Sequence, residues 1–64
     1  MDPTLLVHLN PSGGYDWKRK GVKGAKWNSN VASVDKACDE AVKRGAIETP
    51  FFIQYCDDKD RAKL

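Results

Sequence analysis

A chain of 64 residues, of which 31% are charged and 41% hydrophobic, is long enough for one small domain and has the composition of a folded protein. Its net charge of +2 is too small to indicate nucleic-acid binding by itself. No apolar run approaches the roughly 20 residues of a membrane span, and no secretion signal is recognisable. We therefore expect no membrane association and a cytoplasmic location, in a host cell if a phage encodes the protein.

The first expected element is a strand over residues 4–10. Leu5, Val7 and Leu9 alternate with Leu6 and more polar residues, a period of two. Because Leu6 makes the second face partly apolar, we expect this strand to be covered on both sides. The Asn-Pro-Ser-Gly-Gly run that follows is a turn signal and ends the strand.

Residues 15–20 and 25–28 are predicted to form the two arms of a hairpin. Glycines at positions 21 and 24 bracket its turn. If the turn centres on Val22, Trp17 lies opposite Trp27 across the two strands. The competing interpretation is a loop that its tryptophans hold against the domain.

The clearest expected element is a helix over residues 34–44. Ser33 is suited to cap its first turn, and Gly45 is suited to the left-handed position after its last turn. Its apolar side chains are small and form one narrow stripe, which fits a helix that lies close on a sheet. The stripe consists of Val34, Ala37, Cys38, Ala41 and Val42.

Residues 51–56 are predicted to form a second apolar strand, which Pro50 precedes. Residues 57–64 form a charged tail, expected to be flexible or to become a short helix on a partner. The domain proper is thus residues 1–56. The expected fold class is α+β, a small sheet of three or four strands with one helix packed across one face. The sequence leaves open whether the strands at 4–10 and 51–56 run parallel or antiparallel.

Metal and thiol chemistry have few candidate residues. His8, Cys38 and Cys56 have no spacing that suits a structural zinc, which needs four ligands. We interpret His8 as a surface or edge residue of its strand and Cys38 as a small core residue. Two free thiols are expected, with a Cys38–Cys56 disulfide as the alternative if the protein is secreted. We expect no metal, no cofactor and no enzymatic activity.

Segment 15–27, called here the basic-aromatic segment, is the predicted contact surface. It has five basic residues and one acidic residue, interleaved with aromatic residues. In proteins that bind single-stranded nucleic acid, aromatic rings stack on the nucleobases and basic side chains contact the phosphates. Aromatic residues and arginine also anchor protein interfaces. A third interpretation is that both tryptophans belong to the core. The candidate partner-binding residues are Tyr15, Trp17, Lys18, Arg19, Lys20, Lys23, Lys26 and Trp27.

The leading functional hypothesis is a small binding protein that acts stoichiometrically on a larger protein with an acidic surface patch. Its size and layout resemble those of phage or mobile-element inhibitors of host or defence machinery. The alternative is a nucleic-acid-binding module that uses the same segment. The sequence allows a monomer or a homodimer, because an exposed strand can pair with a second copy.

Overall fold

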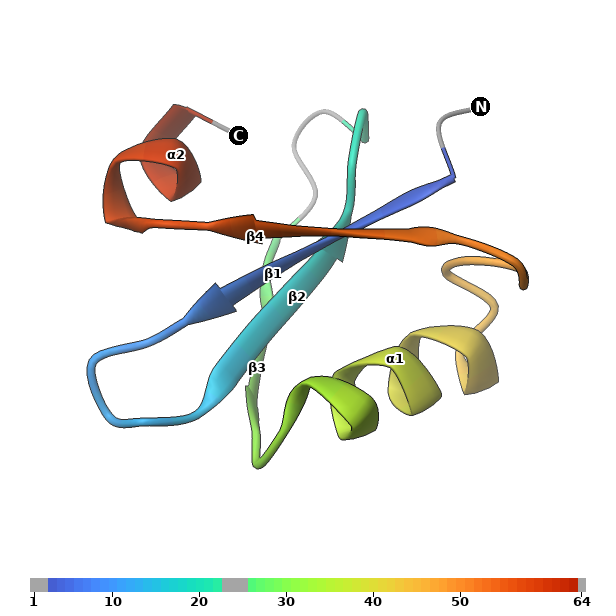
Figure 1. Cartoon of the computed structure of the whole chain (residues 1–64), viewed down its shortest axis with the longest axis horizontal. Coiled ribbons are helices and arrows are strands. Elements are labelled where there is room, and N and C mark those ends of the chain that lie inside the picture. The colour runs from blue at the N-terminus through green and yellow to red at the C-terminus, as the bar shows by residue number, and fades with distance from the viewer. Residues whose placement is uncertain (1–2, 23–25, 64) are drawn as a thin grey trace.

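The computed structural model describes residues 3–22 and 26–63 and confirms the α+β fold class, with a four-stranded sheet and one main helix across one face (Figure 1). The strands are β1 (Thr4–Leu9), β2 (Tyr15–Arg19), β3 (Asn28–Val31) and β4 (Phe52–Cys56), and the helices are α1 (Val34–Lys43) and α2 (Asp58–Lys63). The strand order is β3-β2-β1-β4, so the last strand in the sequence forms an edge of the sheet. In the described ranges, neither helix has the length and apolar character of a bilayer span.

The central strand β1 pairs antiparallel with β2 and parallel with β4, which settles the direction that the sequence left open. The turn between β1 and β2 is built on Asn10, whose side-chain oxygen accepts the backbone N–H groups of Ser12 and Gly14 at 3.0 and 3.1 Å. The connection from β3 to β4 passes through α1, which packs against β1, β2 and β3. The edge strand β4 therefore lies beyond the part of the sheet that α1 covers.

The expected pairing of the two tryptophans is wrong. Trp17 lies opposite Asn28, and the register of β2 and β3 is irregular between Tyr15 and Trp17. Because β3 begins at Asn28, Trp27 precedes the strand, and its ring lies 6.0 Å from that of His8. The turn residues 23–25 lie outside the described residues.

The core lies between α1 and one face of the sheet, called here the helix face. Full burial of a large apolar side chain contributes about 1.5–3 kcal/mol, so the leucine, valine and tryptophan of this cluster carry much of the stability. Two alanines let the helix axis approach the strands closely. The buried cluster consists of Leu5, Val7, Trp17, Ala37, Ala41 and Ile47.

Both ends of α1 are closed as the sequence predicts. The Ser33 hydroxyl accepts the backbone N–H of Lys36 at 3.2 Å, which satisfies one of the unpaired donors of the first turn. At the other end Gly45 has a φ of 72°, a left-handed conformation that costs glycine little, and Ala46 N–H donates to Ala41 C=O at 2.9 Å. These caps fix the length of α1.

The opposite side of the sheet, called here the polar face, carries α2. Where the sequence predicts a charged tail, residues 58–63 form this short helix after β4 (Figure 1). An ion pair joins Arg61 of α2 to Asp16 of β2 at 2.7 Å, and His8 of β1 contacts Asp58 at 2.7 Å. Tertiary contacts of this kind stabilise a helix that is too short to be stable alone.

Candidate protein interface at the sheet edge

The strand β2 divides the predicted basic-aromatic segment between the two faces of the sheet. Successive side chains of a strand point to opposite faces, so Tyr15 and Trp17 pack with the core on the helix face, whereas Lys18 points to the polar face. Trp17 is 2% exposed and lies within the core. The Lys18 side chain is also buried, with its Nζ 5.6 Å from the centre of the Trp27 ring. These residues do not form one continuous surface.

The remaining members of the segment are held in separate places. Arg19 donates to Ala46 C=O at 3.3 Å, and Lys20 donates to the side-chain oxygen of Gln54 at 3.1 Å. Lys26 is exposed, and Lys23 lies outside the described residues. The two tryptophans of the segment lie on opposite faces of the sheet. Partner binding by the segment stays a prediction.

A buried network on the polar face includes residues that the sequence did not single out. Asp16 accepts hydrogen bonds from Asn10 at 3.0 Å and from Arg61 at 2.7 Å. His8, which we interpreted as a surface or edge residue, is only 1% exposed and lies between Arg61 and Asp58. That interpretation is wrong, because β1 is a central strand and α2 covers it. The contacts of this network with α2 join residues 45 to 53 positions apart, so no local motif signals them.

This network has a structural role, because its charged groups are paired with one another. The guanidinium of Arg61 lies 5.3 Å from the centre of the Trp27 ring in addition to its ion pair with Asp16. A buried carboxylate is stable only when it is paired and hydrogen-bonded. The arrangement fastens α2 and Trp27 to the sheet.

The two cysteines lie on opposite sides of the sheet. Cys38 packs against the core on the helix face, whereas Cys56 is next to His8 on the polar face. Both thiols are free, and the sheet between them rules out the alternative disulfide in this fold.

Neither thiol has the environment of an activated nucleophile. Burial raises the pKa of the Cys56 thiol above its ordinary value of 9.0, and the carboxylates of Asp60 and Asp57 raise this pKa further. Burial and the charge of Asp35 likewise raise the pKa of the Cys38 thiol. A reactive cysteine needs the opposite shift. Within residues 3–22 and 26–63, no three His, Cys, Asp or Glu side chains come together as metal ligands.

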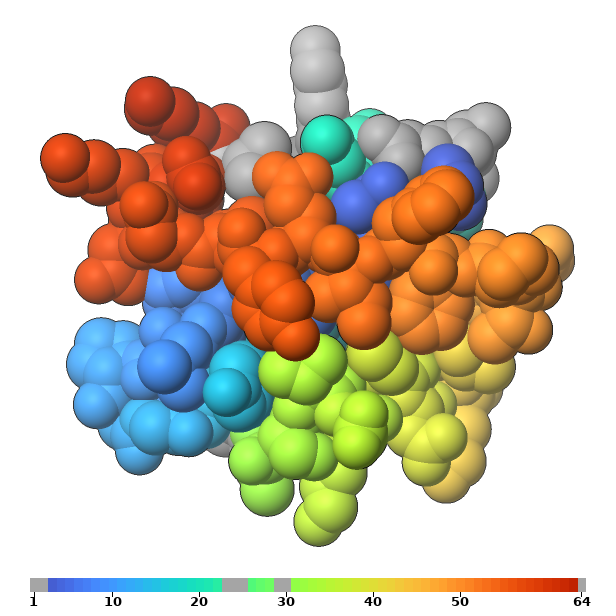
Figure 2. Space-filling view, in the orientation of Figure 1, coloured from blue at the N-terminus to red at the C-terminus, as the bar shows by residue number. Residues whose placement is uncertain are grey.

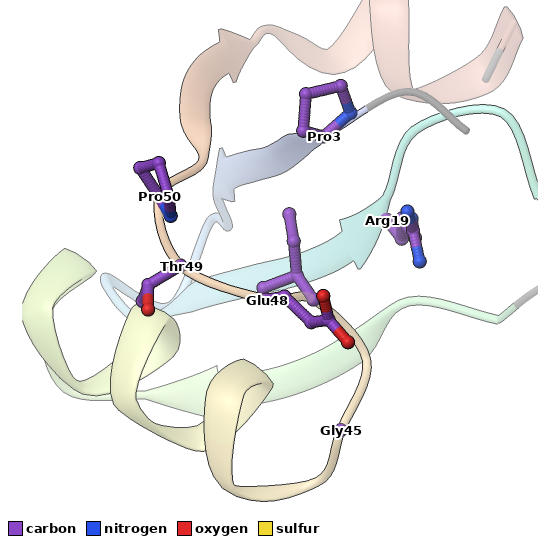
Figure 3. Close-up of a pocket in the computed structure, with 7 residues that line it drawn as sticks. Pro3, Arg19, Gly45, Glu48, Thr49 and Pro50 are labelled. Atoms are coloured by element: carbon purple, nitrogen blue, oxygen red, sulfur yellow. The ribbon is translucent and has the colours of Figure 1, made fainter.

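A hollow of about 440 Å³ opens where the start of β1, the end of β2 and the loop before β4 meet (Figure 3). Arg19 and Pro3 stand on its strand side, and Glu48 and Thr49 belong to the loop (Figure 3). The side chain of Arg19 also holds this loop through Ala46. The hollow thus adjoins the start of β4.

Among the described residues, the two most exposed large apolar side chains belong to the edge strand β4. Phe52 is 70% exposed, Tyr55 67% and Ile53 42%. In Figure 2 the residues of β4, in orange, extend across the middle of the face in view, directly above those of α1. Single exposed apolar residues are common on protein surfaces, so it is the concentration of three on one strand that makes β4 the candidate interaction site of the described residues.

The helix α1 extends this surface on the helix face. Arg44 on one flank of α1 donates to Asn28 of β3 at 3.0 Å, so the other flank, with Cys38 and Val42, faces the β4 side of the sheet. Val42 is exposed, and Cys38 is partly buried. We call the edge formed by Cys38, Val42, Ile53 and Tyr55 on the helix face, together with Phe52 on the polar face of the same strand, the β4 edge.

Comparison with protein-family models, with curated proteins and with solved structures found no match for this chain.

Proposed function

We propose that this protein is a non-enzymatic binding protein that acts stoichiometrically by covering a surface on a larger protein, and that the β4 edge is its contact surface. The observation that supports this is the exposure of Phe52 and Tyr55 on a strand that forms the edge of the sheet. An open strand of this kind offers a partner two things: the apolar area of its aromatic side chains and the unpaired N–H and C=O groups of its backbone.

The contact differs in kind from the one that the sequence suggests. The basic-aromatic segment favoured an acidic patch on the partner, but Trp17 and Lys18 are buried. The β4 edge carries no charged residue from position 51 to position 56. We therefore expect the partner to offer an apolar surface, and binding to depend weakly on salt. Phosphate binding through several lysines would instead fall steeply with salt.

Site-specific photo-crosslinking tests this proposal. Phe52 is replaced by p-benzoylphenylalanine, and Leu9, which is 56% exposed at the end of β1, is replaced in a matched control. We expect a one-to-one adduct with a larger protein from position 52 and none from position 9. Unlabelled protein should compete the adduct away, whereas the Tyr55→Lys variant should not.

Three results contradict the proposal. They are equal crosslinking from positions 52 and 9, adducts with nucleic acid alone, and the absence of any adduct with a larger protein. Fluorescence anisotropy of labelled DNA and RNA at two salt concentrations tests the nucleic-acid alternative directly. Tight binding that collapses with salt would establish that alternative.

A further inference from the structure

The backbone of β4 has hydrogen-bonding groups that point away from the sheet. Phe52 N–H donates to Pro3 C=O at 2.9 Å, and the parallel pairing with β1 continues from Phe52 to Cys56 without a break in register. Peptide groups alternate in direction along a strand, so those of Phe52, Gln54 and Cys56 face β1. The N–H and C=O groups of Ile53 and Tyr55 consequently point to the open side.

These outward groups match those of a second, antiparallel copy of the same strand. With a two-fold axis through Gln54, Ile53 lies opposite Tyr55 of the second copy, and Tyr55 lies opposite its Ile53. In an antiparallel pair, two such opposed residues exchange both of their hydrogen bonds. The two Ile53–Tyr55 pairs therefore satisfy all the outward N–H and C=O groups of these residues.

The side chains fit the same register. Ile53 and Tyr55 are both on the helix face, since they lie beside Leu5 and Val7 of the core, and an aromatic residue opposite a β-branched one is a favourable cross-strand pair. On the polar face, Phe52 lies opposite Cys56 of the second copy. Residues 51–56 themselves carry no charge, but Lys20 donates to the side-chain oxygen of Gln54 at 3.1 Å, so the dimer brings the Lys20 ammonium groups of the two copies close to the axis on the polar face.

The approach to β4 is open on the helix face, where α1 packs against β1, β2 and β3 and leaves Ile53 and Tyr55 exposed. On the polar face α2 contacts the end of β4, and Lys20 donates to Gln54, whereas Phe52 at the start of the strand is exposed. Protein sheets usually protect an edge strand with lysine, proline, a bulge or a covering segment. The residues of β4 include no lysine or proline, and their pairing with β1 shows no bulge.

We propose that the protein, with no other partner present, forms a symmetric homodimer by antiparallel pairing of two β4 strands about Gln54. The two sheets, with four strands each, then form one continuous sheet. The inference goes beyond the proposed function, because it concerns the free chain. It also implies competition, since a partner that binds the β4 edge must displace the second copy.

Sedimentation velocity of the purified full chain tests the dimer. A single added strand is a small interface, so we expect a dissociation constant of roughly 10 μM to 1 mM. Tyr55→Lys puts a charge on the edge and should raise this constant about tenfold or more. The matched control Leu9→Lys changes a similarly exposed residue outside β4 and should leave it unchanged. Far-UV circular dichroism confirms that each variant is folded.

Disulfide trapping tests the register. Single cysteines replace Ile53, Gln54 or Tyr55 in a chain whose Cys38 and Cys56 are alanine. At the proposed axis the two Gln54 Cα atoms lie about 4.5 Å apart, within the range of a disulfide. We expect Gln54→Cys to form a covalent dimer fastest, because Ile53→Cys and Tyr55→Cys each lie opposite a different residue.

Two sets of results overturn the inference. A chain that stays monomeric at about 1 mM, or a dimer that Tyr55→Lys and Leu9→Lys weaken equally, contradicts pairing through β4. Faster trapping at position 53 or 55 contradicts the axis through Gln54. These experiments use the purified chain alone, so a monomer refutes the dimer and leaves the crosslinking test of the proposed function unaffected.

Discussion

Replacing Arg61 by alanine removes the ion pair that fastens α2 to the sheet. The guanidinium lies 2.7 Å from the Asp16 carboxylate, whose side chain is 3% exposed. Removing one partner of a fully buried ion pair costs about 3–5 kcal/mol. Here the Arg61 side chain is 35% exposed, and Asn10 still donates to Asp16 at 3.0 Å, so the cost is lower. A hydrogen bond to a charged group contributes about 1.5–3 kcal/mol, and we expect a loss of about 2 kcal/mol.

This loss is large relative to the whole stability of the domain. At about 0.05–0.15 kcal/mol per residue, a chain of this length has roughly 3–10 kcal/mol in total. The melting temperature should fall by about 8–16 °C, since 1 kcal/mol corresponds to about 4–8 °C in a domain of this size. Urea unfolding followed by far-UV circular dichroism measures the free energy, and thermal unfolding measures the melting temperature.

The matched control is Lys43→Ala. Lys43 pairs with Asp39 at 3.5 Å on the exposed surface of α1, where both side chains are more than 70% exposed. Such a pair contributes at most about 0.5 kcal/mol. If Arg61→Ala lowers the free energy of unfolding by no more than Lys43→Ala does, the ion pair with Asp16 does not hold α2 on the sheet. The flexible tail that the sequence predicts would then be the better description of residues 57–64.

Three further predictions concern the cap, the core and the thiols. Ser33→Ala should lower the free energy of unfolding by about 1 kcal/mol in urea unfolding, because one N–H of the first turn of α1 loses its acceptor; an unchanged value contradicts the cap. Trp27→Phe leaves Trp17 as the single tryptophan, whose fluorescence should resist quenching by acrylamide because its ring is buried. Ready quenching would place Trp17 at the surface. Because the folded state raises the pKa of Cys56, its thiol remains protonated when the unfolded thiol ionises, and the free energy of unfolding should fall as the pH rises above 9.0. Cys56→Ala should reduce this slope, and equal slopes in the two proteins would contradict the shift.

The sequence by itself determined the elements that local rules specify. Ser33 and Gly45 set the ends of α1, because a cap needs a side-chain acceptor at one end and a left-handed residue at the other. The alternation of Leu5 and Val7 predicted a strand, and the burial of Leu6 on its other side confirms that the strand is covered on both faces. These features depend only on residues a few positions apart.

Only the tertiary structure decided which surfaces are open. The composition of the basic-aromatic segment did not show that β2 would turn Trp17 into the core and Lys18 to the polar face. The burial of His8 depends on α2, whose contacts cross about fifty residues of sequence. The exposure of Tyr55 follows from the strand order, which places β4 at the edge. Strand order and face are set by packing between distant segments, so local periodicity predicts that a strand forms but not which neighbour covers it.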